Sequence, residues 1–347
     1  MTPRERVLRC LNHQTADRVP LSGSFRPEVW KELRAYFGTD NTNLINENLG
    51  LDFKGVGMKA AREFLERSGG SSVIRHDNGS YEDAWGVRQI DNGPYMKYVH
   101  HPLSDESSLD TYKFPSLDGR FEGVKARAEQ LKQNYVVSAG TATFFTESWR
   151  LRGLEAFLVD IAMESPFLVK LLDRMLEYKL EIVSQFAQAG VDIISVGGDI
   201  AMHTRLFMDP PLWRKHFKWR DAMLIEAARK YGVQHFYFHT DGNLMEVMED
   251  LIEIGFDIIN PIQPECMDPY EVKERFGDRM TLDGTISSQQ TLPFGTVEDV
   301  RNEVRERIER CGKNGGLVIA PNNVVQFDVP LENLLAVYET AKEVGCP

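Results

Sequence analysis

The sequence contains few cysteines, and they follow no pattern. Among 347 residues there are four, Cys10, Cys266, Cys311 and Cys346, and no two of them form a CxxC pair. A secreted disulfide scaffold needs a dense, regularly spaced cysteine framework, so that class is excluded. Reduced thiols are the expected state, and we predict a cytoplasmic protein.

The chain also lacks an excess of positive charge and any long apolar run. It carries 40 Lys and Arg against 52 Asp and Glu, a formal net charge of −12. Proteins that bind nucleic acid or an anionic membrane present a basic face, so neither partner is expected. No run is long enough to span a bilayer, and the amino-terminal MTPRERVLRC does not resemble a signal peptide.

A repeated helix–glycine–strand pattern is present instead. It occurs at 181–199, 225–242 and 248–264, where Gly190, Gly232 and Gly255 end the helix-like runs. Glycine is favoured at this position because a helix often ends in a left-handed residue. The apolar runs that follow are short, as is typical of strands buried on both faces of a parallel sheet.

These units predict a closed (β/α)8 TIM barrel that forms one domain over 1–347. No early GxGxxG sequence favours a doubly wound sheet. Residues 72–103, with two DNG turns, predict an antiparallel meander inserted as a hairpin decoration over the barrel mouth. Helices are expected at 212–230, 269–276, 297–311 and 331–344. Strands are expected at 18–24, 135–141, 191–199, 233–238, 256–264, 280–287 and 316–323, with an eighth at 51–58.

Polar residues gather at the predicted carboxyl ends of these strands. In a parallel barrel these ends meet at one mouth, where the chemistry is carried. The residues placed there by position are Ser22, Ser24, Arg26, 141–147, Asp199, His203, His239, Asp241, Asn243, Gln263, Glu265, Cys266, Asp283, Thr285, Asn322, Asn323 and Gln326.

One junction, FHTDGN at 238–243, carries three of them. His239 ends an apolar run just before the chain turns, so we predict a site role for it. Asp241 serves either the site or the turn. Asn243 has a simpler alternative role as the N-cap of a helix beginning at Leu244, with Glu246 completing a capping box.

Each of the remaining candidates also has more than one interpretation. Asp199 follows SVGG, whose glycines admit either a close ligand or a tight turn. Glu147 is a ligand, an acid, or an ion-pair partner of Arg150 or Arg152. The aromatic residues at 144–149 line an apolar pocket or pack in the core; they are Phe144, Phe145 and Trp149.

Zinc is the expected metal. Catalytic zinc takes about three ligands from His, Cys, Asp and Glu and leaves one position open. His239 and Cys266, with Asp241 or Glu147, supply such a set from adjacent strands. The other cysteines, Cys10, Cys311 and Cys346, lie in helix-like segments or at the terminus and are expected to be inert.

Several long stretches resemble the uroporphyrinogen decarboxylase superfamily, which includes cobalamin-dependent methyltransferases. They are TPRERVLRCLNHQTADRVPL at the start, GLEAFLVDIAMESPFLVKLLDRMLE at 153–177, 255–287, LPFGTVEDVRNEVRERI at 292–308, and GGLVIAPNN with VPLENLLAVYE near the end. The resemblance covers nearly the whole chain. It implies a (β/α)8 barrel, commonly a homodimer, with its site at the strand carboxyl ends.

The chain departs from two branches of that superfamily. The decarboxylases it resembles carry an arginine-rich RQAGR stretch after the first strand, whereas this chain reads SGSFRPE with Arg26 as the single cation. A porphyrinogen with several carboxylates fits poorly beside Asp199 and Asp241, so that substrate is rejected. The thiol-methylating enzymes use an HxC pair and a later cysteine; here HTD replaces the pair, and Asn322 and Asn323 stand near the later position.

The remaining resemblance is to the methyltransferase I component of anaerobic O-demethylases. It implies transfer of a methyl group from a methoxylated, aromatic donor to the Co(I) corrinoid of a partner protein. Asp199 and Glu147 are the expected acids, Asn322 orients the substrate, and Phe144, Phe145 and Trp149 contact its ring. Two alternatives stay open: a lyase for a smaller acid held by Arg26, and a barrel that only binds a small molecule.

Overall fold

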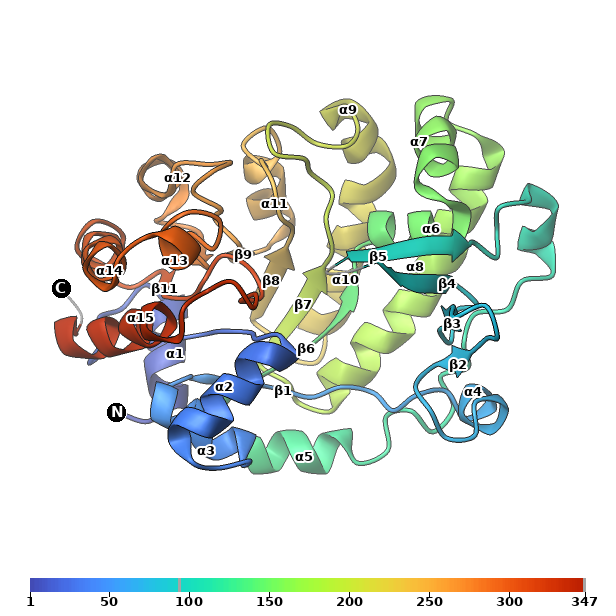
Figure 1. Cartoon of the computed structure of the whole chain (residues 1–347). Helices are drawn as coiled ribbons and strands as arrows, with labels where there is room; N and C mark the ends of the chain where they lie inside the picture. Colours follow the sequence, from blue (N-terminus) through green and yellow to red (C-terminus); the bar gives the residue numbers. More distant parts are fainter. Residues whose placement is uncertain (93–94, 346–347) are drawn as a thin grey trace.

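The protein is described by a computed structural model that covers residues 1–92 and 95–345. Seven parallel strands form one curled sheet in the order β1-β6-β7-β8-β9-β10-β11, with helices packed around its outside (Figure 1). The strands are β1 (Phe53–Gly55), β6 (Val136–Ala142), β7 (Ile193–Gly197), β8 (His235–His239), β9 (Ile258–Asn260), β10 (Thr281–Asp283) and β11 (Leu317–Val318). The architecture is that of a TIM-like α/β fold.

The predicted strand at 18–24 does not form. In its place Leu21 makes an isolated parallel bridge with Ile319 and accepts a hydrogen bond from the Asp52 N–H at 2.9 Å. A second isolated bridge joins Phe25 to Val325. Pro20 has no N–H to donate to a ladder, which explains why this segment connects the two edges of the sheet without forming a regular strand.

Helices cover the outer face of the sheet. The predicted helices at 269–276, 297–311 and 331–344 coincide with observed ones, and the one predicted at 212–230 is divided by a π-helical turn. The helices are α1 (Pro3–Leu11), α2 (Pro27–Phe37), α3 (Thr42–Leu49), α4 (Arg62–Arg67), η1 (Glu106–Asp110), α5 (Val124–Leu131), α6 (Phe144–Arg152), α7 (Leu154–Ala162), α8 (Pro166–Gln188), α9 (Pro210–Trp213), η2 (Arg214–Lys218), α10 (Trp219–Arg229), α11 (Met248–Ile254), α12 (Pro269–Phe276), α13 (Thr291–Phe294), α14 (Val297–Cys311) and α15 (Leu331–Val344).

A separate antiparallel sheet lies within residues 74–100. Its strands, in spatial order, are β2 (Ile74–Arg75), β3 (Tyr81–Glu82), β4 (Arg88–Asn92) and β5 (Tyr95–His100). The sheet contacts α6, because the Tyr98 and Trp149 rings meet edge to face at 4.9 Å and Arg150 donates to Asp83 at 2.5 Å. That this segment covers the mouth of the parallel sheet stays a prediction.

A Gly-x-Asp sequence precedes three of the parallel strands: GLD at 50–52, GVD at 190–192 and GFD at 255–257. Each aspartate lies one residue before its strand, and its carboxylate accepts a backbone N–H from the neighbouring segment. The donors are Leu21 at 2.8 Å, Val137 at 3.0 Å and Phe236 at 2.6 Å, respectively. These bonds fix the register at the amino-terminal end of the sheet, because they satisfy N–H groups that no adjacent strand reaches.

The two ends of the sheet are filled differently. At the amino-terminal end, Val7 and Leu11 of α1 pack against Val136, Ile193 and Ile258. At the carboxyl-terminal end, the register aligns Gly197 of β7 with His239 of β8, and His239 with Asn260 of β9. The polar ends of these three strands therefore lie side by side.

Among the described residues, none of the helices has both the length and the apolar composition that crossing a bilayer requires.

Candidate metal and active site

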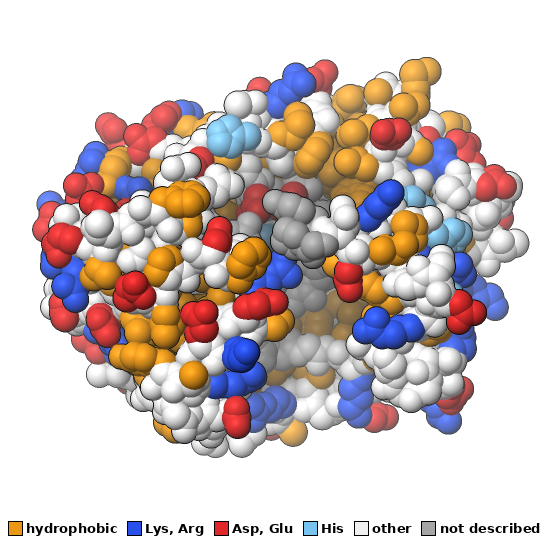
Figure 2. Space-filling model, viewed as in Figure 1, with side chains coloured by type: hydrophobic (Ala, Val, Ile, Leu, Met, Phe, Trp, Pro, Cys, Tyr) orange, Lys and Arg blue, Asp and Glu red, His pale blue; other side chains and the backbone are white. Residues whose placement is uncertain are grey.

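Three candidate ligands meet at the carboxyl-terminal ends of β7 and β8. Asp199, His239 and Asp241 each offer one ligand atom, and these atoms lie within 4.8 Å of one another. Asp199 follows β7 by two residues, and Asp241 follows β8 by two residues. Because parallel strands present their carboxyl ends to one edge, equal offsets from adjacent strands bring the two carboxylates together. Figure 2, viewed as in Figure 1, shows that the surface of the molecule is hollowed near its middle.

The ring of His239 is held in one orientation by the next strand. Its Nδ1 lies 2.6 Å from Oδ1 of Asn260, an acceptor, so Nδ1 carries the proton. The Asn260 amide also hydrogen-bonds to the Asp283 carboxyl, which accepts from the Tyr237 hydroxyl at 2.9 Å. Burial raises the pKa of Asp283 to about 7. This network leaves Nε2 of His239 with a free lone pair, the tautomer that a metal ligand requires.

Asp241 has one satisfied and one unsatisfied oxygen. Its Oδ2 accepts from the Asn323 amide at 2.5 Å, whereas its Oδ1 is buried and has no partner among the described residues. Its backbone N–H donates to Oδ1 of Asp199 at 2.9 Å. Burial and the Asp199 carboxylate raise the pKa of Asp241 to about 6. A buried carboxylate oxygen without a donor is costly unless a proton or a cation meets it.

Two glycines allow the loops to approach one another at this site. Gly198 has φ 134°, and a Cβ there would lie 2.5 Å from Oγ1 of Thr146. Gly242 has φ 94°, and a Cβ there would lie 2.5 Å from the Met202 carbonyl oxygen. Both the backbone conformation and the close contacts exclude a side chain, so Asp199 and Asp241 are brought together by these two turns.

The donor set fits a divalent cation. It provides one imidazole nitrogen and carboxylate oxygens from two residues, which zinc and other first-row divalent ions accept. The orphaned Oδ1 of Asp241 and the free Nε2 of His239 are the atoms that such an ion would satisfy. The set contains no sulfur, so the centre is harder than a zinc–thiolate site.

The two other ligands predicted from the sequence lie outside this group. Cys266 is partly buried, and its Sγ lies 3.3 Å from Nδ1 of His203. Burial and the charges of Glu265 and Asp241 raise the pKa of the Cys266 thiol to about 11, which disfavours the thiolate that binds metal. Glu147 is buried on α6, where it accepts from Arg150 at 3.3 Å, one of the ion pairs expected from the sequence. Cys346 lies outside the described residues.

The predicted aromatic cluster is divided between core and surface. Phe144 and Phe145 are each 1% exposed, and Phe145 stacks on Phe207 with centroids 5.4 Å apart. As placed, these two rings belong to the core and do not face an open pocket. Trp149 is partly buried against Tyr98. The difference arises because α6 begins at Phe144 and directs its first turn inward.

The asparagines also differ from expectation. Asn322 is 2% exposed; its carbonyl accepts from the Ser288 N–H at 3.1 Å, and its amide donates to Glu265 at 3.2 Å. Its neighbour Asn323 is the one that reaches Asp241. Asn243 does not cap a helix at Leu244, because α11 begins at Met248; its side chain instead closes a local turn with the Met245 N–H at 3.0 Å.

Arg26, proposed to hold a carboxylate, is exposed at the start of α2, and its Nε donates to Gln326 at 3.3 Å. Asn260 and Asn323 are the site residues that the sequence reasoning missed or left without a role. Asn260 directly precedes Pro261 at the end of an apolar run, and a polar residue at that position was the available signal.

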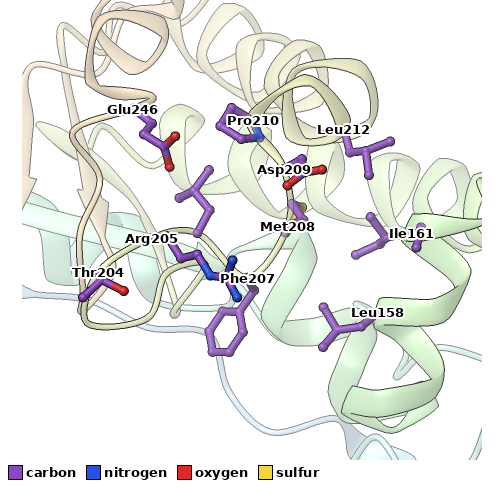
Figure 3. Close-up of a pocket in the computed structure, with 12 residues that line it drawn as sticks. Leu158, Ile161, Thr204, Arg205, Phe207, Met208, Asp209, Pro210, Leu212 and Glu246 are labelled. Carbon is purple, nitrogen blue, oxygen red and sulfur yellow. The ribbon is translucent and has the colours of Figure 1, made fainter.

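A separate pocket of about 560 Å³ lies on the surface between α7, the 204–209 loop and the start of α9. Figure 3 shows Leu158, Ile161 and Leu212 on one side of it, with Arg205 and Glu246 across from them. None of the three candidate ligands lines this pocket. It therefore belongs to the rim of the fold and not to the candidate centre.

The fold and site together define a TIM-like α/β protein with a candidate metal centre at the strand carboxyl ends. A sequence profile of the uroporphyrinogen decarboxylase (URO-D) family matches residues 89–344. The chain belongs to this family, which confirms the resemblance found in the sequence.

Relatives in the family carry two kinds of activity. A methylcobamide:CoM methyltransferase, MtaA, of Methanosarcina barkeri is 23% identical over 251 residues, covering 72% of this chain and 70% of that protein. A uroporphyrinogen decarboxylase of Psychromonas ingrahamii is 23% identical, covering 99% of this chain and 98% of that protein. A solved methyltransferase from Methanosarcina mazei shares the fold, with a TM-score of 0.69, 20% identity and 99% coverage of both chains.

Proposed function

We propose that the protein is an enzyme that transfers a methyl group from a methoxylated, aromatic donor to the Co(I) corrinoid of a partner protein. The observation that carries the proposal is the group formed by Asp199, His239 and Asp241 at the strand carboxyl ends. Its support from relatives is the methylcobamide methyltransferase MtaA. The donor and the partner corrinoid protein are part of the proposal, as is a homodimeric assembly.

A zinc ion held by these three residues would supply a Lewis acid for the oxygen that the methyl group leaves. The protein's own contribution is to present the ligands in the correct form. Asn260 keeps the lone pair of His239 on Nε2, and Asn323 holds one oxygen of Asp241 so that the other faces the centre. Asp199, predicted from the sequence as an acid, then acts as a ligand, and Cys266 and Glu147 are not needed to complete the set.

The test is methyl transfer by the purified protein. It is mixed with a Co(I) corrinoid protein and a panel of methoxyarenes, and formation of methylcobalamin is followed by its absorbance. We expect transfer from at least one donor and a loss of about 100-fold or more in Asp241→Asn, because transition-state stabilisation by a metal is worth several kcal/mol.

The matched control is Asp278→Asn, which makes the same change on an exposed carboxylate that pairs with Arg279 before β10. It should transfer at the wild-type rate. No methylcobalamin from any donor, or equal rates in Asp241→Asn and the wild type, would contradict the proposal.

A second candidate function is decarboxylation of a small acid, favoured by the decarboxylase relative that spans 99% of this chain. Arg26 would then bind the carboxylate and Asp199 would donate the proton. Arg26→Ala separates the two functions: it would abolish turnover of an acid and leave transfer from a neutral methoxyarene intact.

A further inference from the structure

A second cavity of about 460 Å³ lies between the carboxyl-terminal half of β6 and the helices α6 and α8. Met58, Trp85, Tyr178 and Ile182 supply its apolar walls, and Glu147 and Lys179 are the charged residues that line it. Trp85 and Tyr178 stand edge to face, with centroids 5.3 Å apart. A volume in this range, with mostly apolar walls and a few polar groups, is typical of a small-molecule site.

This cavity borders the candidate metal centre. Gly197 at the end of β7 lines it, and in the sheet register Gly197 pairs with His239. A Cβ on Gly197 would lie 3.6 Å from Cβ of His239. Gly197 therefore places the cavity beside the base of the His239 side chain on the neighbouring strand β8.

Lys179 has a role that the proposed metal chemistry leaves unexplained. Its side chain is 1% exposed, and its Nζ donates to Oγ1 of Thr141 at 3.0 Å and to the Ala142 carbonyl at 2.7 Å. The third N–H has no hydrogen-bond acceptor among the described residues, where the ammonium also lies over the Phe144 ring at 5.5 Å from its centroid. No ion pair within 4.0 Å involves Lys179 there. Burial lowers its pKa to about 8, against the opposing charges of Glu147 and Asp221.

A buried ammonium that lacks a direct counter-ion is costly to keep. Its two hydrogen bonds go to β6, so the ammonium is fixed at the edge of the cavity. A fixed cation beside an apolar cavity is suited to meet negative charge that develops on a bound molecule.

On the basis of the proposed methyl transfer, we propose that this cavity holds the methyl donor as an aryl methyl ether. Its ring lies against Trp85 and Tyr178, and its ether oxygen lies at the Lys179 ammonium. The lining supports this donor class, because the side chains of Trp85 and Tyr178 favour an aromatic ring and a single fixed cation favours an oxygen that gains charge.

The O–CH3 bond breaks with its electron pair staying on oxygen, and the methyl carbon bonds to the electron pair of the Co(I) nucleophile on the partner corrinoid. The Lys179 ammonium gives one proton to the same oxygen that the zinc would polarise, so a neutral phenol leaves. Lys179 then regains a proton from solvent, and Glu147 offsets its charge within the cavity.

The decisive experiment compares Lys179→Met with the wild type across aryl methyl ethers whose phenols differ in acidity. If Lys179 protonates the oxygen, the loss in kcat grows from about tenfold for acidic phenols toward about 10⁴-fold for weakly acidic ones, in the range of general acid catalysis. A purely structural role would lower all rates by one common factor, and that result would overturn the assignment of Lys179.

The cavity is tested separately by binding. Ile182→Trp fills it, and Leu158→Trp makes a matched change in the pocket of Figure 3. By calorimetry, Ile182→Trp should weaken binding of the methoxyarene and its phenol at least tenfold, while Leu158→Trp leaves it unchanged. Equal binding in both variants would overturn the cavity assignment, even if Lys179→Met does not fold. Binding that Ile182→Trp removes, without methyl transfer by the wild type, would refute the proposed function but retain the binding site.

Discussion

The carboxylates at the two ends of the parallel sheet differ in their charged partners. At the amino-terminal end, Asp52 accepts from Arg6 at 2.6 Å and from Arg18 at 2.8 Å, and Asp192 accepts from Arg4 at 2.6 Å. At the carboxyl-terminal end, Asp199 and Asp241 lie together, and within the described part of the chain neither has a Lys or Arg partner.

This contrast indicates that the amino-terminal end of the sheet stabilises the fold and the carboxyl-terminal end serves the function. Charges at the amino-terminal end are compensated by the chain itself, so their interactions are complete once the protein folds. The carboxylates at the carboxyl-terminal end lack some of their partners: Oδ1 of Asp241 is buried and has no hydrogen-bond donor among the described residues. In TIM-like folds the first end is the stabilising one and the second is the one that binds ligands.

The largest effect on folding is expected from Asp52→Ala, which leaves buried guanidinium groups without their shared carboxylate. Breaking a buried ion pair from one side costs about 3–5 kcal/mol, so urea unfolding should show a loss of that size. Asp278→Ala, on an exposed carboxylate, is the control and should unfold like the wild type. If Asp52→Ala is equally stable, the contrast between the two ends is wrong.

A smaller effect, on metal binding, is expected from Asn260→Ala. Asn260 does not touch the metal but orients His239, and such supporting residues typically contribute about 10–100-fold in metal affinity. Zinc titration against a competing chelator measures the change. Asn243→Ala removes an amide that bonds to the Cys266 carbonyl, and its affinity should stay at the wild-type value. A similar affinity for both variants would remove Asn260 from the site.

Low pH should weaken metal binding at the group of Asp199, His239 and Asp241. The pKa of Asp241 is raised to about 6 in the folded protein, above its unfolded value, so this group's contribution to apo-protein stability is present at low pH and is lost as pH rises through about 6. A metal needs the carboxylate, so its affinity should fall about tenfold per pH unit below 6. Zinc affinity measured from pH 5 to 8 tests this, and a flat profile would contradict it.

The smallest effect is expected from Cys266→Ser. The thiol has a raised pKa and lies outside the group of Asp199, His239 and Asp241, so zinc affinity should change by less than about threefold. A loss of 100-fold or more would instead show that Cys266 supplies the sulfur ligand that the sequence first indicated.

Much of the fold could be predicted because its signals are local. Helices that end in glycine and buried apolar runs indicate where the strands lie. Asp199 and Asp241 could be predicted as site residues because each lies two residues past the end of its strand, β7 or β8. The prediction of a strand at 18–24 was wrong because Pro20 has no N–H to donate, which interrupts the hydrogen-bond ladder. The role of Phe144 and Phe145 was unpredictable because helix orientation, not residue type, decides whether a ring faces core or cavity.

The roles of Asn260 and Lys179 could not be predicted from the sequence. Their importance depends on what lies opposite them after folding: His239 for the first, and an apolar cavity for the second. Asn260 lies 21 residues from its partner, and Lys179 lies on a helix that only the folded sheet brings to β6. No periodicity or spacing in the sequence encodes those contacts.

The most direct test of the account is the metal content of the purified protein and of its His239→Ala and Asp241→Asn variants, measured by elemental analysis after equilibration with zinc. We expect about one zinc per wild-type chain and close to none in either variant, with all three proteins folded. No zinc in the wild type, or a full equivalent retained by both variants, would contradict it.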